Sequence, residues 1–558
     1  MPSERTQPHL KGVLGRFSRG LAVLRRDGLW RTFERLKLLR YEREYRAWAP
    51  LFSDLTDADR ESIRAHLSNG GSRPRFSVLM PTYNTPKAIL EAAIRSVEEQ
   101  LYPEWQLCIV DDCSTDASVR EVLTAAERRD PRITVRYRSS NGHISAATNE
   151  ALSLATGEYV AFLDHDDLLA EDALFQAYTV LSKAPEIRLL FTDEDLIDEQ
   201  GQRVRPLCKP GLDRELLLSQ NSVCHLLVVA TNEVRAVGGF RTGVEGAQDW
   251  DLVLRLLERL TDRQISHLPQ VLYHWRVTPS STAGGQSQKP YVAEAQRRVV
   301  EEHLVRSGLS DGVVTLVPSA VQIRTTFQLA EPLPPVLIGV TNEQELSLLK
   351  EATDYSGVRY WVMGDSGLSG LLQHNSVGDP APFVATVGPG VRPECSDWLR
   401  RLVGRARRSQ IHSVGGVVLG SGGVVLSAGC FVSQNGDLRR LHEALSLHNP
   451  GFYNSMLVPF SVSAVEPCCA LYRLGALFSS QEGPSFTLRF APPPGLRAVS
   501  DPTVRFSSRT GLPPVSYAGL LQDGCIVERH FNPLRSEAAP QLGLAFPPRY
   551  VKPWGSLA

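Results

Sequence analysis

The sequence predicts an α/β protein with three parts: a helical N-terminal region, a main domain built on a mainly parallel sheet, and a second domain of similar build. In the main domain, short apolar segments alternate with amphipathic ones, which is the pattern of a parallel sheet with helices on both faces. A second series of similar apolar segments begins near residue 335. At 558 residues the chain is also too long for one hydrophobic core. We therefore place the three parts at residues 1–72, 73–310 and 335–558.

The composition is that of an ordinary soluble globular protein, with 42% hydrophobic and 22% charged residues. The formal net charge of −1 gives no reason to expect a nucleic-acid partner. Nine cysteines are scattered without metal-finger spacing, which fits a reducing compartment better than a disulfide framework. No apolar run approaches the ~18–20 residues that cross a bilayer. We expect a cytoplasmic protein.

The N-terminal region is basic, because residues 1–50 contain twelve Lys and Arg against five Asp and Glu, an excess of seven positive charges. Apolar residues recur there at steps of three and four, from Leu14 to Leu39, between the basic ones. This spacing predicts an amphipathic basic helix. Two interpretations stay open: docking on an anionic membrane surface, and a helical arm packed on the next domain.

The main domain is expected to contain strands and helices in alternation. The strands are predicted at residues 76–80, 106–110, 133–137, 159–163 and 189–192. The helices are predicted at residues 87–100, 117–128, 144–155 and 171–182. Parallel sheets of this kind bind ligands at the carboxyl ends of their strands, so the residues that follow each strand are the informative ones.

Polar and acidic residues follow three of these strands: PTYN at 81–84, DDCSTD at 111–116 and DHDD at 164–167. Carboxylates gathered along one sheet edge repel each other unless a cation or a cationic ligand lies between them. Hard oxygen ligands favour Mg²⁺ or Mn²⁺, which such sites share with phosphate oxygens. A single aspartate can instead cap a helix, and this is the alternative role for Asp116 and Asp167. The set as a whole predicts a divalent cation site.

Five motifs in this region resemble family 2 inverting glycosyltransferases of the GT-A fold, and they occur in the family's order. They are MPTYNTP (80–86), IVDDCSTD (109–116), GHISAATNEALSLATGEYVAFLDHDD (142–167), EGAQDWDLVLRL (245–256) and HLPQVLYHWR (267–276). The resemblance covers about residues 76–285 and is closest to large bacterial members that assemble surface polysaccharide or O-antigen. It implies a GT-A catalytic domain, which is Rossmann-like with a mainly parallel sheet.

The resemblance also implies a nucleotide-diphosphate sugar as donor and a divalent cation, Mn²⁺ or Mg²⁺. The residues that match the family's donor-binding positions are Pro81, Tyr83, Asp111, Asp112 and Asp164. Of these, Tyr83 would pack against the base, Asp112 would accept a hydrogen bond from a uracil-type ring, and Asp164 would reach the ribose. Asp166 matches the metal ligand, with Asp164 beside it.

The position that matches the family's catalytic base is Asp249, in the motif QDWD. Gln248 stands where the wider family has Glu, which leaves the role of Asp249 intact. The chemistry agrees, because an inverting displacement needs a carboxylate that takes the proton of the acceptor hydroxyl, apart from those that hold the cation. Asp251, two residues later, is expected to be a surface or capping charge.

Two further features have open interpretations. His274, in LYHWR, matches a late histidine that binds the metal or the diphosphate in some GT-A enzymes. Its alternative is a histidine whose hydrogen bonds are satisfied in or beside a strand. The acidic segment TDEDLID (192–198) follows the fifth predicted strand, and we interpret it as acceptor-side or structural.

The second series of apolar segments looks like a repeat of the first. FVATVGPGV (383–391) lies over YVAFLDHDD (159–167) letter by letter. The three carboxylates of DHDD are replaced in this alignment: Asp164 by Gly388, Asp166 by Gly390 and Asp167 by Val391. We therefore predict a degenerate GT-A-like domain at 335–558 that lacks the metal-binding carboxylates and ends in a Pro-rich tail. Its role is open between acceptor binding, pairing with another subunit and bracing of the main domain.

Together these features predict an inverting glycosyltransferase that moves a sugar from a nucleotide diphosphate to a glycan or lipid-linked glycan acceptor in bacterial cell-surface polysaccharide synthesis. It would act in the cytoplasm, with peripheral contact to the inner face of the cell membrane through residues 1–50. One alternative is a sugar-nucleotide nucleotidyltransferase, but PTYN stands where such enzymes carry a Gly-rich phosphate loop. The other is a catalytically inactive glycan-binding or scaffold protein of the same pathway. The sequence does not indicate an oligomeric state.

Overall fold

The computed structural model describes residues 39–40, 42–51, 53–277, 290–317, 322–340, 342–362, 381–432, 438–449, 451–479, 487–488, 492, 495–508 and 511–512. Two predictions lie outside these residues: the amphipathic basic pattern up to residue 38 and the Pro-rich C-terminal tail. Among the helices of the described part, none is long and apolar enough to cross a membrane.

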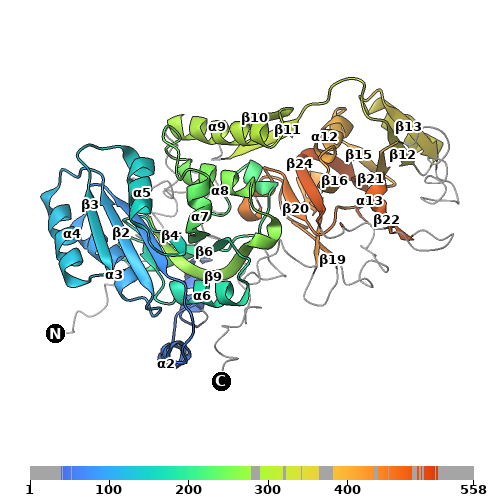
Figure 1. The fold of residues 1–558 in the computed structure, drawn as a ribbon. Helices are drawn as coiled ribbons and strands as arrows, with labels where there is room; N and C mark the ends of the chain where they lie inside the picture. The colour runs from blue at the N-terminus through green and yellow to red at the C-terminus, as the bar shows by residue number, and fades with distance from the viewer. Residues whose placement is uncertain are drawn as a thin grey trace, which may run out of the picture.

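The chain forms two α/β units with a helix and a hairpin between them (Figure 1). The first unit holds a nine-stranded sheet in the order β3-β2-β1-β4-β8-β6-β9-β5, with β7 paired to β6. Its strands are β1 (Phe76–Thr82), β2 (Trp105–Asp111), β3 (Ile133–Tyr137), β4 (Tyr159–Phe162), β5 (Leu168–Leu169), β6 (Leu189–Ile197), β7 (Arg203–Leu207), β8 (Leu227–Ala230) and β9 (Ile265–Arg276). β3, β2, β1 and β4 run parallel, β8 is antiparallel to both β4 and β6, and β9 is parallel to β6.

Helices cover both faces of this sheet. They are α3 (Lys87–Glu98), α4 (Ala117–Arg129), α5 (His143–Leu154), α6 (Ala173–Lys183), α7 (Thr231–Ala236) and α8 (Gln248–Leu257). Alternate residues of β1 supply two cores, because Val78 and Met80 pack with α3, α4 and α6, whereas Leu79 packs with α5, α7 and α8. Asp116 caps α4 by accepting a hydrogen bond from Ser118 N at 2.9 Å. This layered arrangement confirms the α/β class predicted for the main domain.

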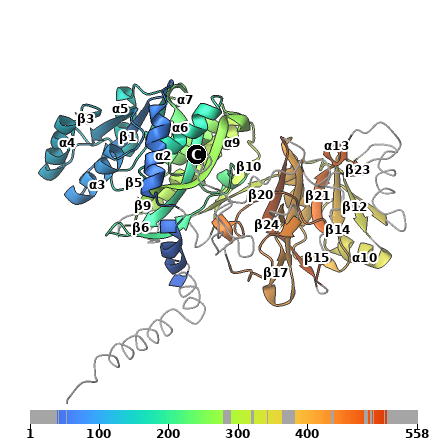
Figure 2. The same ribbon diagram turned by 90° about the horizontal axis from the view of Figure 1, so that it is seen from below.

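The N-terminal residues that the structure describes pack on this first unit. They form helical residues 42–51 and α2 (Asp57–Ser68), followed by the irregular stretch 69–75. Tyr45 is fully buried and donates a hydrogen bond from its hydroxyl to Asp195 at 2.7 Å. α2 lies against α6, where the rings of His66 and Phe175 meet at 5.7 Å (Figure 2).

The predicted elements of the main domain agree closely with the structure, with one error. The acidic residues 192–197 do not follow the fifth strand but form the second half of β6. Two of the buried carboxylates there, Asp193 and Asp195, have partners that offset their desolvation. Asp193 accepts a hydrogen bond from Lys209 N at 2.8 Å and pairs with the His267 ring at 2.9 Å. Asp195 pairs with Arg203 in addition to Tyr45.

The second unit holds another nine-stranded sheet, in the order β13-β12-β14-β21-β16-β24-β15, with β17 paired to β16 and β20 to β24. Its strands are β12 (Val336–Val340), β13 (Val358–Val362), β14 (Phe383–Val387), β15 (Val391–Pro393), β16 (Ile411–Leu419), β17 (Val425–Ser427), β20 (Phe460–Val462), β21 (Cys469–Arg473) and β24 (Arg497–Ser508). Two small ribbons join β18 (Cys430–Val432) to β19 (Leu438–Arg440) and β22 (Phe478–Ser479) to β23 (Thr487–Leu488). The helices are α10 (Glu343–Glu351), α12 (Trp398–Ala406) and α13 (Leu474–Leu477).

Strand for strand, this second sheet has the order of the first without β3. The path β2-β1-β4-β8-β6-β9-β5 corresponds to β13-β12-β14-β21-β16-β24-β15, and the parallel and antiparallel neighbours match along both paths. The pairings of β4 with β1 and of β14 with β12 begin at Tyr159 and Phe383. Counting on from these two residues puts Gly388 at the position of Asp164.

Between the two sheets lie α9 (Pro290–Arg306) and the hairpin of β10 (Gly312–Leu316) and β11 (Ile323–Phe327) (Figure 1). α9 shares a core with α8 through Val299, Val300 and Trp250. β11 meets α12 of the second unit so closely that a Cβ atom on Gly404 would lie 2.3 Å from the carbonyl oxygen of Phe327. The hairpin therefore packs directly on both units.

Candidate active site

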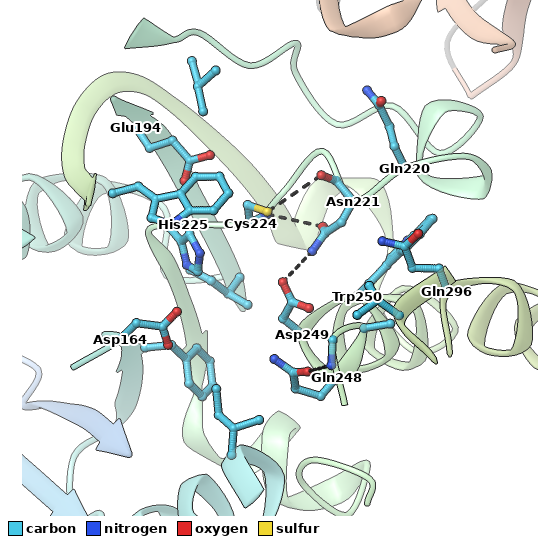
Figure 3. A pocket seen from close by; sticks show the side chains of 18 of the residues that line it. Asp164, Glu194, Gln220, Asn221, Cys224, His225, Gln248, Asp249, Trp250 and Gln296 are labelled. Carbon is cyan, nitrogen blue, oxygen red and sulfur yellow. Dashed lines mark hydrogen bonds between the residues drawn. The ribbon is translucent and has the colours of Figure 1, made fainter. Parts of the chain in front are cut away.

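A cavity of about 790 Å³ lies at the carboxyl ends of β1 and β4 (Figure 3). Its walls include Pro81 and Asp164 from these strand ends and Asp249 from the start of α8. The second unit also contributes to the wall, through Tyr453 and Asn454. The cavity has the size of an ordinary small-molecule site.

Strand pairing explains why the predicted donor-binding residues share one edge. β1 and β2 are parallel and pair up to Thr82 and Asp111, and β4 runs parallel to β1 on its other side. The loops that follow three parallel neighbours meet at the carboxyl edge of the sheet. Tyr83, Asp112 and Asp164 begin these loops and are therefore neighbours in space.

The two carboxylates at the end of β2 are already held by protein partners. Asp111 accepts a hydrogen bond from the Ser114 hydroxyl at 2.5 Å. Asp112 lies 2.9 Å from Arg138 Nε and accepts a hydrogen bond from one backbone N–H at 2.9 Å. Tyr83, by contrast, is 44% exposed, so its ring offers a face on which a nucleotide base can stack.

Three side chains at the end of β4 stand close enough to share one cation: Asp164, Asp167 and His225, whose ligand atoms lie within 4.8 Å of one another. Both oxygens of Asp167 are engaged, because they accept hydrogen bonds from the Tyr273 hydroxyl at 2.6 Å and from Arg276 N at 2.7 Å. Asp167 therefore holds the loop after β4 against β9 and does not cap a helix. Asp164 is the carboxylate of this loop that lines the cavity.

The acidic groups at the cavity make ionisation of their neighbours less favourable. Burial, together with the charges of Asp166 and Asp249, raises the pKa of Asp164 to about 7. A buried cluster of carboxylates gains from a bound cation, which removes this repulsion. Asp166, the predicted metal ligand, is not part of the three-residue cluster, although its charge acts on Asp164. Carboxylate oxygens are hard ligands of the kind that Mg²⁺ and Mn²⁺ prefer, so the residues present fit a divalent cation.

His225 is a candidate ligand that the sequence analysis missed. It stands just before β8, which is antiparallel to β4, and its ring stacks on Tyr273 with centroids 4.5 Å apart. Burial, helped by the charge of Lys209, lowers the pKa of His225 to about 3, so the ring is neutral and keeps a nitrogen lone pair. The signal that could have found it is a histidine immediately before a buried strand, but only the strand order shows that this strand lies beside Asp164.

Asp249 is well placed to act as a base. It is the second residue of α8, and its Oδ2 accepts a hydrogen bond from Asn221 Nδ2 at 2.8 Å (Figure 3). Burial raises the pKa of Asp249, which strengthens it as a proton acceptor. Asn221 belongs to no motif in the sequence, so its contact with Asp249 could not have been predicted.

Glu194 is a second carboxylate that lines the cavity (Figure 3). Its side chain is buried, and Oε2 has no hydrogen-bond partner among the described residues, although Lys209 Nζ lies 3.7 Å away. Burial raises the pKa of Glu194 to about 7 despite the charge of Lys209. Glu194 comes from the TDEDLID segment, so that segment contributes one side chain to the cavity, while Asp193 and Asp195 are buried against protein partners.

Two further predicted residues, His274 and Asp251, are paired with charged side chains of the first unit. His274 Nδ1 lies 2.6 Å from Asp195 Oδ1, as expected for a histidine satisfied within a strand, and His274 is not part of the three-residue cluster that could hold a metal. The prediction that Asp251 is a surface or capping charge is wrong: it is fully buried and pairs with Arg241 and Arg255. Their guanidinium groups offset the cost of burying its charge.

Comparison with known proteins places this site in a family. Residues 77–194 match the family model described as glycosyl transferase family 2. The chain is 30% identical over 190 residues to EpsE of Bacillus subtilis, which is named as a glycosyltransferase, and the match covers 34% of this chain and 68% of that protein.

Two longer relatives match over most of this chain. It is 34% identical over 484 residues to the uncharacterized protein y4gI of Sinorhizobium fredii, which covers 80% of this chain and 53% of that protein. It is 30% identical over 429 residues to the O-antigen biosynthesis protein RfbC of Myxococcus xanthus, which covers 70% of this chain and 33% of that protein. The chain thus spans about half the length of the first of these relatives and a third of the second.

Proposed function

The chain belongs to glycosyl transferase family 2, and we propose that it is an inverting glycosyltransferase that moves a sugar from a nucleotide diphosphate to a hydroxyl group of a glycan or lipid-linked glycan. One observation carries this proposal: a single cavity has Asp164, of the acidic cluster, on one wall and Asp249, a separate carboxylate, on another. The first suits a leaving diphosphate with its cation, and the second suits proton removal from an acceptor.

In this mechanism Asp249 takes the proton of the acceptor hydroxyl while the hydroxyl oxygen attacks the anomeric carbon of the donor. The bond between that carbon and the diphosphate oxygen breaks on the opposite face, which inverts the configuration. Asn221 holds one oxygen of Asp249 at 2.8 Å, so the orientation of the carboxylate is fixed before the reaction.

The donor nucleotide is assigned to Pro81, Tyr83, Asp111, Asp112 and Asp164, as the family resemblance implies. Mg²⁺ or Mn²⁺, held by Asp164 and Asp166 with neutral His225 as a third candidate ligand, would neutralise the charge of the leaving diphosphate. His274, whose Nδ1 is held by Asp195, stays a further candidate ligand through its other ring nitrogen.

The second unit is, in this proposal, a degenerate copy of the first at residues 335–558. The shared strand order supports it, and so does the state of the former site. Gly388 leaves no room for a carboxylate, because a Cβ atom there would lie 2.6 Å from the Cβ of Cys468. The cavity beside it measures about 50 Å³, too small for a nucleotide sugar.

The proposed setting is bacterial cell-surface polysaccharide synthesis in the cytoplasm. RfbC, named for O-antigen biosynthesis, supports this setting, and the excess of seven positive charges in residues 1–50 supports peripheral contact with the inner face of the membrane. If the contact is electrostatic, binding to anionic vesicles should weaken as salt rises and vanish when residues 1–50 are deleted.

Titration calorimetry with UDP, TDP and GDP, with and without Mn²⁺, tests the donor site. We expect one nucleotide to bind in a Mn²⁺-dependent manner, and Asp166→Ala to abolish the Mn²⁺ dependence. Asp57→Ala is the control, because Asp57 lies exposed on α2 with 98% of its side chain accessible. Binding that survives Asp166→Ala unchanged, or no binding of any nucleotide, would favour the inactive glycan-binding or scaffold alternative.

A further inference from the structure

Residues 213–221 of the first unit are held by the second unit at three points. Ser461 donates two hydrogen bonds to Asp213, from its N–H at 2.8 Å and from its hydroxyl at 2.7 Å. Glu215 pairs with Arg405 at 3.0 Å and also with Arg408. Asp213, Glu215, Ser461 and Arg405 are all buried, so the two units meet here as parts of one structure.

The third point lies in the wall of the cavity. Gln220 Nε2 donates to the carbonyl oxygen of Tyr453 at 2.7 Å, and Asn454 Nδ2 donates to Gln220 Oε1 at 3.0 Å. The next residue, Asn221, donates to Asp249. Two adjacent residues, Gln220 and Asn221, therefore connect the second unit to the proposed base: one is hydrogen-bonded to the second unit and the other to Asp249.

The position of this contact identifies the side of the cavity it serves. Figure 3 shows Asp249 between Asp164 on one side and Asn221 with Gln220 on the other. An inverting displacement brings the acceptor to the face opposite the leaving group. If the diphosphate lies at Asp164, the acceptor therefore approaches from the side of Gln220, where Tyr453 and Asn454 line the wall.

We propose that residues 451–454 of the second unit form the acceptor subsite and bind a sugar of the acceptor glycan beside Asp249. This inference rests on the proposed function and adds what the second unit does. Tyr453 supplies an aromatic ring of the kind that packs against the apolar face of a sugar. The Asn454 amide uses one N–H on Gln220, and its second N–H and its oxygen have no partner among the described residues.

The backbone of this segment is held in an uncommon conformation. Gly451, Tyr453 and Asn454 all have positive φ, at 74°, 49° and 59°. Such values cost free energy at Tyr453 and Asn454 and persist where surrounding contacts impose them, which is common at binding sites. Gln220 supplies two of the contacts that impose the conformation.

Cys224 provides a probe of this wall that does not depend on any substrate. Its side chain lines the same cavity, and its alkylation can be followed by peptide mass spectrometry. Tyr453→Ala should speed alkylation of Cys224 several-fold, because the wall loses its ring. Tyr360→Ala, the same change on β13 of the second unit, should leave the rate unchanged.

The nature of the ligand is tested by protection. Methyl glycosides of glucose, galactose, mannose, N-acetylglucosamine and rhamnose are added in turn, and at least one should slow alkylation of Cys224 in the unaltered protein. That protection should be lost in Tyr453→Ala and in Asn454→Ala but kept in Tyr360→Ala. Absence of protection by every glycoside, or protection that survives both substitutions, would overturn the assignment.

Nucleotide binding separates this inference from the proposed function. In Tyr453→Ala the Mn²⁺-dependent affinity for the nucleoside diphosphate should stay within twofold of the unaltered value, because the donor half of the cavity belongs to the first unit. A loss of nucleotide affinity as large as the loss of glycoside protection would assign Tyr453 to the donor and overturn the acceptor subsite. If the unaltered protein binds no nucleotide, the proposed function fails, while glycoside protection still decides whether residues 451–454 bind a sugar.

Discussion

The two sheets of this chain share an order of strands and differ at one edge. Strand pairing puts Gly388 at the position of Asp164 and Val418 at the position of Glu194. The matching inner strands β1 and β12 keep the same buried, mostly apolar character in both sheets. The comparison shows that strand interiors determine the sheet, whereas the residues at and just past the strand ends determine its chemistry, and the two can change independently.

The difference also concerns space. By the same pairing, Cys468 of the second sheet stands where His225 stands in the first. His225 stacks on Tyr273 and leaves a cavity of about 790 Å³ beside Asp164, whereas Cys468 reaches the position that a side chain on Gly388 would need. The matching position of the second sheet therefore has neither the charges nor the space found in the first.

The largest expected effect comes from removing the proposed base of the first unit, Asp249. Asp249→Asn should lower the transfer rate by ~10²–10⁴-fold, because the amide cannot take a proton. Nucleotide binding measured by calorimetry should be unchanged. Full activity in Asp249→Asn would remove the chemical contrast between the sheets and require another base, for which Glu194 is the candidate.

A second effect concerns the contact between the sheets. Arg405→Ala leaves Glu215 and Asp501 buried with fewer partners, and breaking such a pair costs ~3–5 kcal/mol of folding free energy. The urea midpoint should fall accordingly. Arg401→Ala is the matched control on the same helix, because Arg401 is 39% exposed and its pair with Asp397 is worth ~0–1 kcal/mol. Equal midpoints for the two variants would mean that the sheets are not coupled through Glu215.

The same contact predicts a dependence on pH. Burial alone would raise the pKa of Glu215, but Arg408 and Arg405 outweigh it and hold the pKa at about 2, below its ordinary value of 4.5. A lowered pKa stabilises the fold above pH 4.5, and this stabilisation of about 3 kcal/mol is lost as the pH falls toward 2. Urea midpoints between pH 6 and pH 2.5 should fall less steeply in Glu215→Gln than in the unaltered protein. An equally steep fall of the urea midpoint in both proteins would contradict the lowered pKa of Glu215.

The smallest effect tests whether the second site is sterically closed. Gly388→Ala should destabilise the chain by ~1–3 kcal/mol, because the new Cβ would lie 2.6 Å from that of Cys468. Adding Cys468→Gly should restore part of the loss. Gly475→Ala is the control, since no heavy atom lies within 4 Å of the position its Cβ would take. If Gly388→Ala leaves the free energy of unfolding unchanged, this position can still accommodate a side chain.

Much of the first sheet could be predicted from the sequence, because its strands are defined by short stretches of consecutive residues. The apolar segments and the turns between them define β1 to β4, and β3 occupies the residues predicted for it. The acidic second half of β6 was not predicted to be a strand, because its carboxylates are stabilised by hydrogen bonds to residues far away in the sequence, such as Tyr45 and His267. No local sequence pattern indicates such a long-range pairing.

The site was predictable only where its residues lie in motifs. Asp164 and Asp249 stand in recognisable segments, and both line the cavity. His225 and Asn221 reach it through the antiparallel insertion of β8, and Tyr453 comes from more than two hundred residues farther along the chain. Their contribution depends on strand order and on the docking of two units, which a single sequence does not specify.

The anchoring of residues 213–221 has a consequence for how such a chain can change over generations. A duplicated domain that has lost its own activity can ordinarily be deleted without harm. Here deletion would leave Asp213 and Glu215 without the partners that Ser461 and Arg405 supply, and would free the segment that ends beside Asp249. If the second unit is a degenerate copy, as proposed, its own sheet edge can go on changing, whereas loss of the whole unit would remove these buried contacts.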